Sequence, residues 1–212
     1  ANLPNYLGNH SYAYGGYAKV ISCYNFTKDR HGEVIFCLQT ASDLTGYTLA
    51  FDEIRNAFTS FYSFNADMMA CYENQLISFK GGNLYIHNSS TQNNFYGTQY
   101  NSYIKLVFNK DGIIKKTFDY LTIDATDYWT SPTMGDINTP LGQSSNLVQE
   151  DFEIDEGLYN AAFWMDNNSL GGLVNGDYLK GDWIEVKLSN SATNLVYLSS
   201  LYLGYILSNR NT

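Results

Sequence analysis

Hydrophobic and polar positions alternate in short runs along most of the chain. Aromatic and β-branched residues fill these runs, and Gly, Asn and Asp residues separate them. Such runs predict β-strands, and their spacing of roughly ten residues in the first half is typical of a sandwich, a barrel or propeller blades. The predicted strands cover residues 18–26, 33–40, 47–53, 58–64, 75–82, 83–88, 102–109, 113–124, 157–166, 179–190 and 194–208.

Turn residues predict how some of these strands connect. Gly81 and Gly82 fit a tight turn that requires positive φ, and they predict a hairpin between the strands on either side. Asp111 and Gly112 predict a second hairpin, with longer strands. A short helix is expected near residues 67–72, but no long amphipathic helix is present in the pattern.

The expected fold class is therefore all-β, with propeller-like strands followed by an antiparallel sandwich-like domain and no long helices. Residues 1–17 are expected to form an irregular arm, because Gly and Asn interrupt every periodicity there. The propeller-like region is expected over residues 18–95 and the sandwich-like region over 96–212. Residues 128–146 hold two of the three prolines and predict a long loop. Loops of this length usually have a function or contact a partner.

Composition and charge narrow the function classes. Charged residues make up 16% and aromatic residues 16%, which excludes the highly charged kind of disorder. Residues 107–212 carry 14 acidic and 6 basic side chains, and most of the net charge of −9. Clustered Lys and Arg, which nucleic acid binding requires, are missing.

No apolar run is long enough to predict a membrane-spanning helix. The start at Ala1 indicates a piece of a longer chain or a processed product.

Five carboxylates crowd together in the sequence QEDFEIDEG: Glu150, Asp151, Glu153, Asp155 and Glu156. In a strand, Asp151, Glu153 and Asp155 lie on one face, because alternate residues share a face. Two interpretations stay open, a solvated edge or a Ca²⁺ or Mg²⁺ site, although the DxDxDG calcium pattern is absent. A glycosidase needs two carboxylates roughly 5–10 Å apart across a cleft, and adjacency in sequence does not supply that separation.

No pattern of catalytic or metal-ligating residues is found. His10, His31 and His87 lack metal-ligand spacing, and no nucleophile motif or phosphate loop accompanies them. The three cysteines form no CxxC pair and are expected to be free thiols. We therefore expect a protein that is not an enzyme, with no cofactor, no metal and no catalytic residues.

Aromatic residues are the most unusual feature of the composition. Exposed Tyr and Trp side chains anchor protein interfaces and also stack on sugars. Trp129 lies in the predicted long loop, and Tyr96 and Tyr100 lie in the segment NNFYGTQY. These three are the candidate interface residues. Trp164 and Trp183 lie in predicted strands and are expected in the core.

Several segments, taken in order, carry a resemblance that covers residues 45–210. They resemble the C-terminal portion of the tail muzzle or nozzle proteins, also called tail stabilisation proteins, of crAss-like and related short-tailed phages of Bacteroidetes. The segments are TLAFDEIRNAFTSFYSFNADMM, LISFKGGNLYIHN, NNFYGTQYNSYIKLVFN, KKTFDYLTID, VQEDFEIDEGLYNAAFWMD, YLKGDWIEVKLSN and LYLGYILSN.

The resemblance implies a structural virion protein of the phage tail. Its subunits are expected to form a homo-oligomeric ring, usually a hexamer, that closes the tail and conducts DNA during ejection. The expected partners are other tail proteins, and the genomic DNA passes through without being specifically bound. Assembly is expected in the cytoplasm of the bacterial host. The acidic excess of the second half suits a channel that does not retain DNA.

A second function class stays open beside this one. The chain is alternatively a carbohydrate-binding or glycan-degrading β domain of a tail fibre or of a gut bacterium. The position of the aromatic and acidic side chains discriminates between the two. A single concave cleft with facing carboxylates favours the glycan function, and dispersed flat patches favour assembly.

Overall fold

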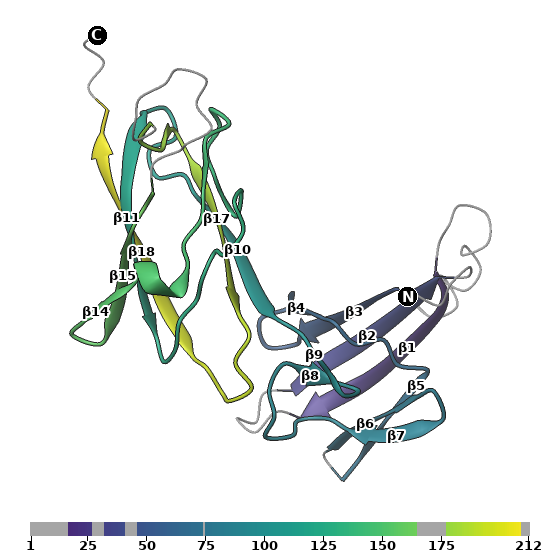
Figure 1. The fold of residues 1–212 in the computed structure, drawn as a ribbon. Coiled ribbons are helices and arrows are strands. Elements are labelled where there is room, and N and C mark those ends of the chain that lie inside the picture. The colour runs from purple at the N-terminus through teal and green to yellow at the C-terminus, as the bar shows by residue number, and fades with distance from the viewer. Residues whose placement is uncertain (1–16, 27–31, 41–45, 74, 165–176, 209–212) are drawn as a thin grey trace. The chain divides into compact units, whose positions relative to one another are not determined.

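The computed structural model describes residues 17–26, 32–40, 46–73, 75–164 and 177–208. The chain divides into two compact units, unit 1 (Ala1–Tyr100) and unit 2 (Asn101–Thr212). Within the described residues every regular element is a β-strand, apart from the single 3₁₀ turn η1 (Gln149–Asp151) (Figure 1). The all-β expectation is therefore confirmed. The irregular arm expected over residues 1–17 lies outside the described residues except for Tyr17.

Unit 1 is built on a four-stranded antiparallel sheet whose strands follow one another in the chain. Each strand pairs with the next one in sequence, and one face of the two central strands is buried. Ile35, Cys37 and Ala50 lie on this buried face and pack in one cluster with Phe64 and Leu76. The strands are β1 (Tyr17–Phe26), β2 (Gly32–Thr40), β3 (Gly46–Asp52) and β4 (Ala57–Tyr62).

A three-stranded antiparallel sheet completes this core: β5 (Met68–Tyr72), β6 (Gln75–Lys80) and β7 (Asn83–Ile86). The hairpin predicted at Gly81 and Gly82 is confirmed, with φ of 57° and 81° at the two glycines. The short helix expected near 67–72 is wrong, because β5 occupies those residues. Met69 is the one buried residue of β5, and it pairs with Ser78 on β6. The strand conformation therefore buries the Met69 side chain and also gives the backbone of β5 its hydrogen-bond partners.

The propeller-like arrangement expected for residues 18–95 is not formed by its described residues. A propeller repeats four-stranded blades around a central channel. Unit 1 instead has one four-stranded and one three-stranded sheet on a shared core, with a two-stranded hairpin of β8 (Asn94–Phe95) and β9 (Thr98–Gln99). The ten-residue spacing reflects antiparallel strands joined by short turns, which a meander and a propeller blade have in common.

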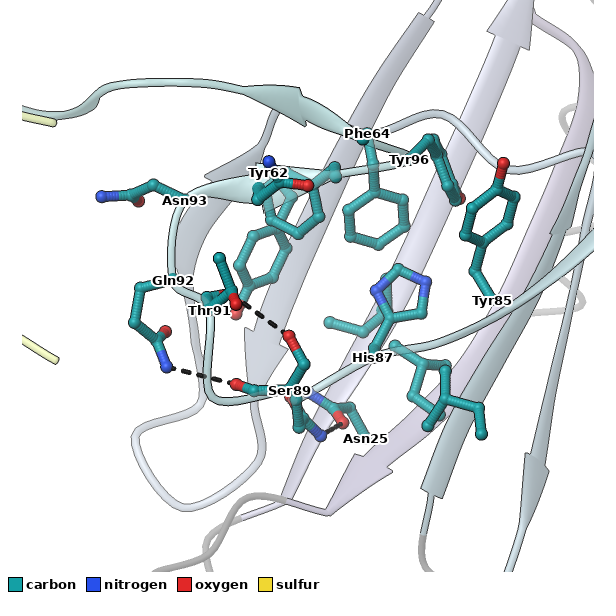
Figure 2. A pocket seen from close by; sticks show the side chains of 17 residues that line it. Asn25, Tyr62, Phe64, Tyr85, His87, Ser89, Thr91, Gln92, Asn93 and Tyr96 are labelled. Atoms are coloured by element: carbon teal, nitrogen blue, oxygen red, sulfur yellow. Dashed lines mark hydrogen bonds between the residues drawn. The ribbon is translucent and has the colours of Figure 1, made fainter. Parts of the chain in front are cut away.

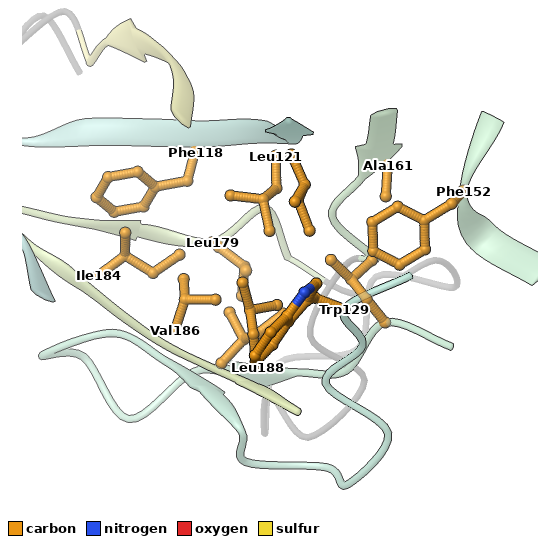
Figure 3. Packing of buried hydrophobic residues seen from close by; sticks show 12 residues of the cluster. Phe118, Leu121, Trp129, Phe152, Ala161, Leu179, Ile184, Val186 and Leu188 are labelled. Atoms are coloured by element: carbon orange, nitrogen blue, oxygen red, sulfur yellow. The ribbon is translucent and has the colours of Figure 1, made fainter. Parts of the chain in front are cut away.

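Unit 2 is an antiparallel sandwich of two sheets. The first has the order β10–β17–β12–β13, and the second has the order β14–β15–β11–β16, with β18 also paired to β11. Side chains from both sheets form a single buried cluster (Figure 3). The strands are β10 (Ser102–Phe108), β11 (Lys116–Ala125), β12 (Ile137–Asn138), β13 (Ser144–Ser145), β14 (Glu153–Asp155), β15 (Leu158–Ala162), β16 (Lys180–Gly181), β17 (Ile184–Asn190) and β18 (Leu198–Leu207).

The hairpin predicted around Asp111 and Gly112 is wrong. β10 and β11 do follow one another, but β10 pairs with β17 and β11 pairs with β15, β16 and β18. The turn therefore carries the chain from one sheet to the other.

Lys116 is a buried cation at the start of β11. Its side chain is almost fully buried, and its Nζ donates to the carbonyl oxygens of Asp111 (3.2 Å), Ile114 (3.0 Å) and Asp182 (2.8 Å). The same ammonium group lies over the Tyr205 ring, with 5.8 Å between Nζ and the ring centre. Three acceptors and an aromatic face offset the cost of burying this charge.

Candidate functional site

Tyr96 occupies a tight turn in unit 1 between β8 and β9. Tyr96 has φ of 55° and Gly97 has φ of 81°, so both central residues of the two-residue turn are left-handed. Glycine adopts this conformation freely, but for a bulky side chain it costs about 1–3 kcal/mol. The surrounding contacts must therefore hold the tyrosine in place.

Those contacts come from a buried serine and a second tyrosine. Ser78, fully buried on β6, lies 2.9 Å from the Tyr96 hydroxyl and 2.6 Å from Nε2 of His87. The Tyr85 ring packs edge-on against the Tyr96 ring, with 4.7 Å between the ring centres. Ser78 on β6 is therefore hydrogen-bonded both to His87, which follows β7, and to Tyr96 in the turn between β8 and β9.

Further rings extend this group inward. The centre of the buried Phe64 ring lies 4.7 Å from that of His87 and 5.1 Å from that of Phe95. Tyr62 stacks on Phe64 at 5.7 Å, and its hydroxyl donates to the Glu33 carboxylate at 3.0 Å. Burial raises the pKa of Tyr62 above its ordinary range, and the neighbouring Glu33 carboxylate raises it further.

This aromatic group forms one wall of a partly open pocket of about 330 Å³, and all of the residues that line it belong to unit 1. Figure 2 shows the rings of Phe64, Tyr85, His87 and Tyr96 on one side and the side chains of the 88–93 loop on the other. Across the loop, Ser89 Oγ donates to the Thr91 carbonyl (3.3 Å), and Gln92 Nε2 donates to the Ser89 carbonyl (3.4 Å). We call this cavity the Tyr85–Gln92 pocket.

The lining of the Tyr85–Gln92 pocket carries no Asp, Glu, Lys or Arg among its seventeen residues. Burial lowers the pKa of His87 below its usual value, so its imidazole is neutral at pH 7. Asn25, which is buried, accepts a hydrogen bond from Asn88 Nδ2 at 2.7 Å across the base of the loop. The pocket is therefore polar but uncharged.

The candidate interface residues of unit 1 are half-buried. Tyr96 lines the Tyr85–Gln92 pocket, and Tyr100 donates its backbone N–H to the Asn93 carbonyl at 2.7 Å. The Tyr100 ring lies 6.0 Å from that of Phe95. The structure thus brings both tyrosines to the same loop. It adds Tyr85 and Gln92, which the sequence analysis did not single out, and His87, which the sequence analysis considered only as a metal ligand or catalyst.

The expectation that Trp129 is exposed is wrong. Its side chain is only 9% exposed and lies within the core cluster of unit 2, close to Leu188 (Figure 3). The loop that carries it is fastened by pairing of Thr130 with Ser189 and of Ser131 with Leu147. These bridges turn the loop inward, so its aromatic side chain completes the core instead of meeting solvent.

Trp164 was expected in the core and is 60% exposed. It lies two residues beyond the end of β15, after Phe163, whose backbone N–H still donates to the Asp119 carbonyl at 2.9 Å. The Trp164 side chain therefore lies outside the paired part of the sheet. Trp183, also expected in the core, is half-buried at the residue before β17.

The acidic residues lie on the surface of unit 2. Glu150, Glu153, Asp155 and Glu156 are exposed. Asp151 is half-buried in η1, where its carboxylate accepts the Val148 backbone N–H at 2.7 Å. Asp151 therefore stands in a 3₁₀ turn and does not continue the strand alternation of β14. Across the residues that the structure describes, no three His, Cys, Asp or Glu side chains converge on a possible metal position.

Unit 1 also has an exposed apolar sheet face that the sequence analysis did not predict. On the side of the sheet away from the core, cross-strand partners are apolar or aromatic. Phe58 and Phe61 on β4 are 60% and 71% exposed. The ring of Phe58 packs edge-on against Phe51 (5.3 Å) and Phe36 (6.3 Å). We call this surface the β2–β4 outer face, made of Val34, Phe36, Leu38, Tyr47, Leu49, Phe51, Phe58 and Phe61.

Part of this chain is similar to a known protein family. Residues 90–165 match the family model of the Crassvirus muzzle protein C-terminal domain. This match confirms the resemblance to the C-terminal portion of a phage muzzle protein, and it indicates a structural protein of the phage tail. The muzzle C-terminal domain match begins in the loop of the Tyr85–Gln92 pocket and continues just past β15 in unit 2. A comparison with curated proteins finds no match.

The structure adds one observation on membranes. Among the residues that it describes, no helix has the length and apolar character needed to cross a bilayer.

Proposed function

We propose that the protein is a subunit of a muzzle ring that closes the phage tail and conducts DNA during ejection. The match of residues 90–165 to the muzzle C-terminal domain carries this proposal. The partners are further copies of the chain, six in a closed ring, and other tail proteins. Assembly takes place in the host cytoplasm, and the ring functions in the virion.

The exposed apolar β2–β4 outer face supports the proposal that copies of the chain associate with one another. Large exposed apolar patches rimmed by polar residues mark interaction sites on soluble proteins. Aromatic side chains such as Phe58 and Phe61 are enriched at the centres of such interfaces. A cyclic ring requires two complementary surfaces on each subunit, and the β2–β4 outer face is the proposed first one.

Charge at this face is expected to break the ring. We expect light scattering to give a closed oligomer for the protein and a monomer for the Phe58→Glu/Phe61→Glu variant, since burying two carboxylates without partners is strongly unfavourable. Ile113→Glu is the matched control, because Ile113 is 91% exposed on a turn of unit 2. A monomer for the unmodified protein at every concentration, or an intact ring for the double variant, would contradict the proposal.

We further propose that the acidic segment of unit 2 faces the DNA path. Carboxylates at the wall keep the duplex from binding, because each neutralised phosphate adds salt-dependent retention. Glu153, Asp155 and Glu156 are exposed, and their reversal leaves the Asp151 hydrogen bond in η1 intact.

We expect phage particles with Glu153→Lys, Asp155→Lys and Glu156→Lys to assemble and to eject DNA more slowly. The delay should shrink as salt is raised, since salt shortens the distance over which exposed charges interact, which is about 8 Å at physiological ionic strength. Particles with Glu53→Lys, Glu73→Lys and Asp119→Lys, three other exposed carboxylates, carry the same change in net charge. Equal ejection kinetics for both sets would show that the segment does not face the DNA.

A further inference from the structure

The ring proposed above does not account for the Tyr85–Gln92 pocket, which has the dimensions and chemistry of a ligand site. Its volume of about 330 Å³ lies at the lower end of small-molecule sites, which span ~300–1,000 Å³. It combines an aromatic wall with convergent polar side chains. Empty packing cavities are typically apolar, and the lining of this pocket is not.

The absence of charge in the described lining excludes several ligand classes. Phosphate and carboxylate groups are recognised by Arg, Lys or helix N-termini, and hard cations are bound by carboxylates. None of the seventeen lining residues is acidic or basic, apart from His87, which is neutral at pH 7. A ligand of this pocket is therefore uncharged.

The polar groups exclude a purely apolar ligand. Seven lining residues carry carboxamide or hydroxyl side chains on the loop side, apart from the tyrosines. Some of these groups already pair with one another or with the backbone of the loop, as Asn88 does with Asn25. An apolar molecule would still strip water from their remaining donors and acceptors, at a cost of about 1–3 kcal/mol for each one left unpaired. The ligand must supply both hydrogen-bonding groups and an apolar face.

The site is held in shape before any ligand arrives. Ser78 fixes the Tyr96 hydroxyl and Nε2 of His87, which leaves Nδ1 as the remaining hydrogen-bonding atom of that imidazole. Tyr96 keeps a left-handed backbone that its side chain disfavours. Strain of this kind clusters at ligand sites, where it preorganises side chains.

We propose that the Tyr85–Gln92 pocket binds an uncharged sugar residue. A pyranose presents C–H groups on one face, which pack on aromatic rings, and hydroxyl groups around its edge, which pair with carboxamides. The wall of Tyr85, Phe95 and Tyr96 and the carboxamide of Gln92 supply these two kinds of contact. The pocket has no carboxylates, so it binds the sugar and does not hydrolyse it.

The test is a titration of the protein followed by NMR, with methyl glycosides of glucose, galactose, mannose and N-acetylglucosamine as probes. We expect saturable shifts of the His87 ring signals with at least one probe. The matching glucuronic acid glycoside should bind about tenfold more weakly, because its carboxylate meets no cation. Tyr85→Ala and Gln92→Ala should each weaken binding about tenfold, as expected for one lost ring contact or hydrogen bond.

Two variants serve as matched controls, Tyr72→Ala and Gln75→Ala, because both residues are exposed in unit 1 and lie outside the pocket. They should bind within twofold of the unmodified protein. Gln92→Ala decides the result if Tyr85→Ala fails to fold, since Gln92 lies on the loop side of the pocket. No binding of any neutral probe, equal binding of the charged glycoside, or unchanged affinity for Gln92→Ala would overturn the proposal. Ring formation is measured separately and does not depend on this outcome.

Discussion

Replacing Trp129 by Ala is expected to destabilise unit 2 by about 3–5 kcal/mol, the usual cost of truncating a buried Trp. For a unit of this size the loss lowers the melting temperature by roughly 10 to 20 °C. The reason is the position of the indole ring between the two sheets, among Leu188 and the other core side chains. A cavity there removes contacts from both sheets at once.

Intrinsic tryptophan fluorescence is the appropriate measurement, because all three tryptophans lie in unit 2. Trp164→Ala is the matched control and should change the stability by less than about 1 kcal/mol, since its side chain is largely exposed. If Trp129→Ala instead left the melting temperature unchanged and impaired oligomer formation, Trp129 would be an interface residue and its burial in the core would be wrong.

Replacing Lys116 by Met is expected to cost roughly 2–4 kcal/mol of the free energy of unfolding. Methionine fills a similar volume but donates no hydrogen bond, so the carbonyls of Asp111, Ile114 and Asp182 lose their shared donor. Two of these carbonyls lie in the turn that carries the chain from β10 to β11. The substitution therefore loosens the crossing between the two sheets.

Urea unfolding followed by tryptophan fluorescence measures this change. Lys115→Met is the matched control, because the neighbouring lysine is exposed and is expected to tolerate the same substitution within about 0.5 kcal/mol. Equal stability of both variants would mean that water satisfies the three carbonyls and that the ammonium contributes nothing net.

The strands were predictable wherever burial follows strict alternation. In β17 every second residue is buried, and the apolar positions of IEVKLSN show this directly. The two glycines between β6 and β7 identify their hairpin because a two-residue turn of this type needs positive φ at both central residues, which glycine adopts freely. Pairing partners were not predictable in the same way, since β10 and β11 look like a hairpin locally but belong to different sheets.

The candidate site was only partly predictable, for a physical reason that two residue groups illustrate. Trp129 sits in an irregular segment, and only its long-range bridge to β17 turns it inward. The base of the Tyr85–Gln92 pocket is formed where Asn88 in the loop donates a hydrogen bond to Asn25 on β1, and these two residues are far apart in the sequence. The density of Asn, Gln and aromatic residues over 85–97 was the available signal, but composition does not reveal a concave surface.

The pairing of β11 has a consequence for synthesis on the ribosome. The four strands of the first sheet of unit 1 each pair with the next strand to emerge, so that sheet can form while translation continues. β11 pairs along nearly its whole length with β18, which is made much later. Contacts so distant in sequence slow folding and leave strand edges open in the meantime. The sheet of the second unit therefore cannot be completed until β18 has been made, and until then the unpaired edge of β11 is open to aggregation.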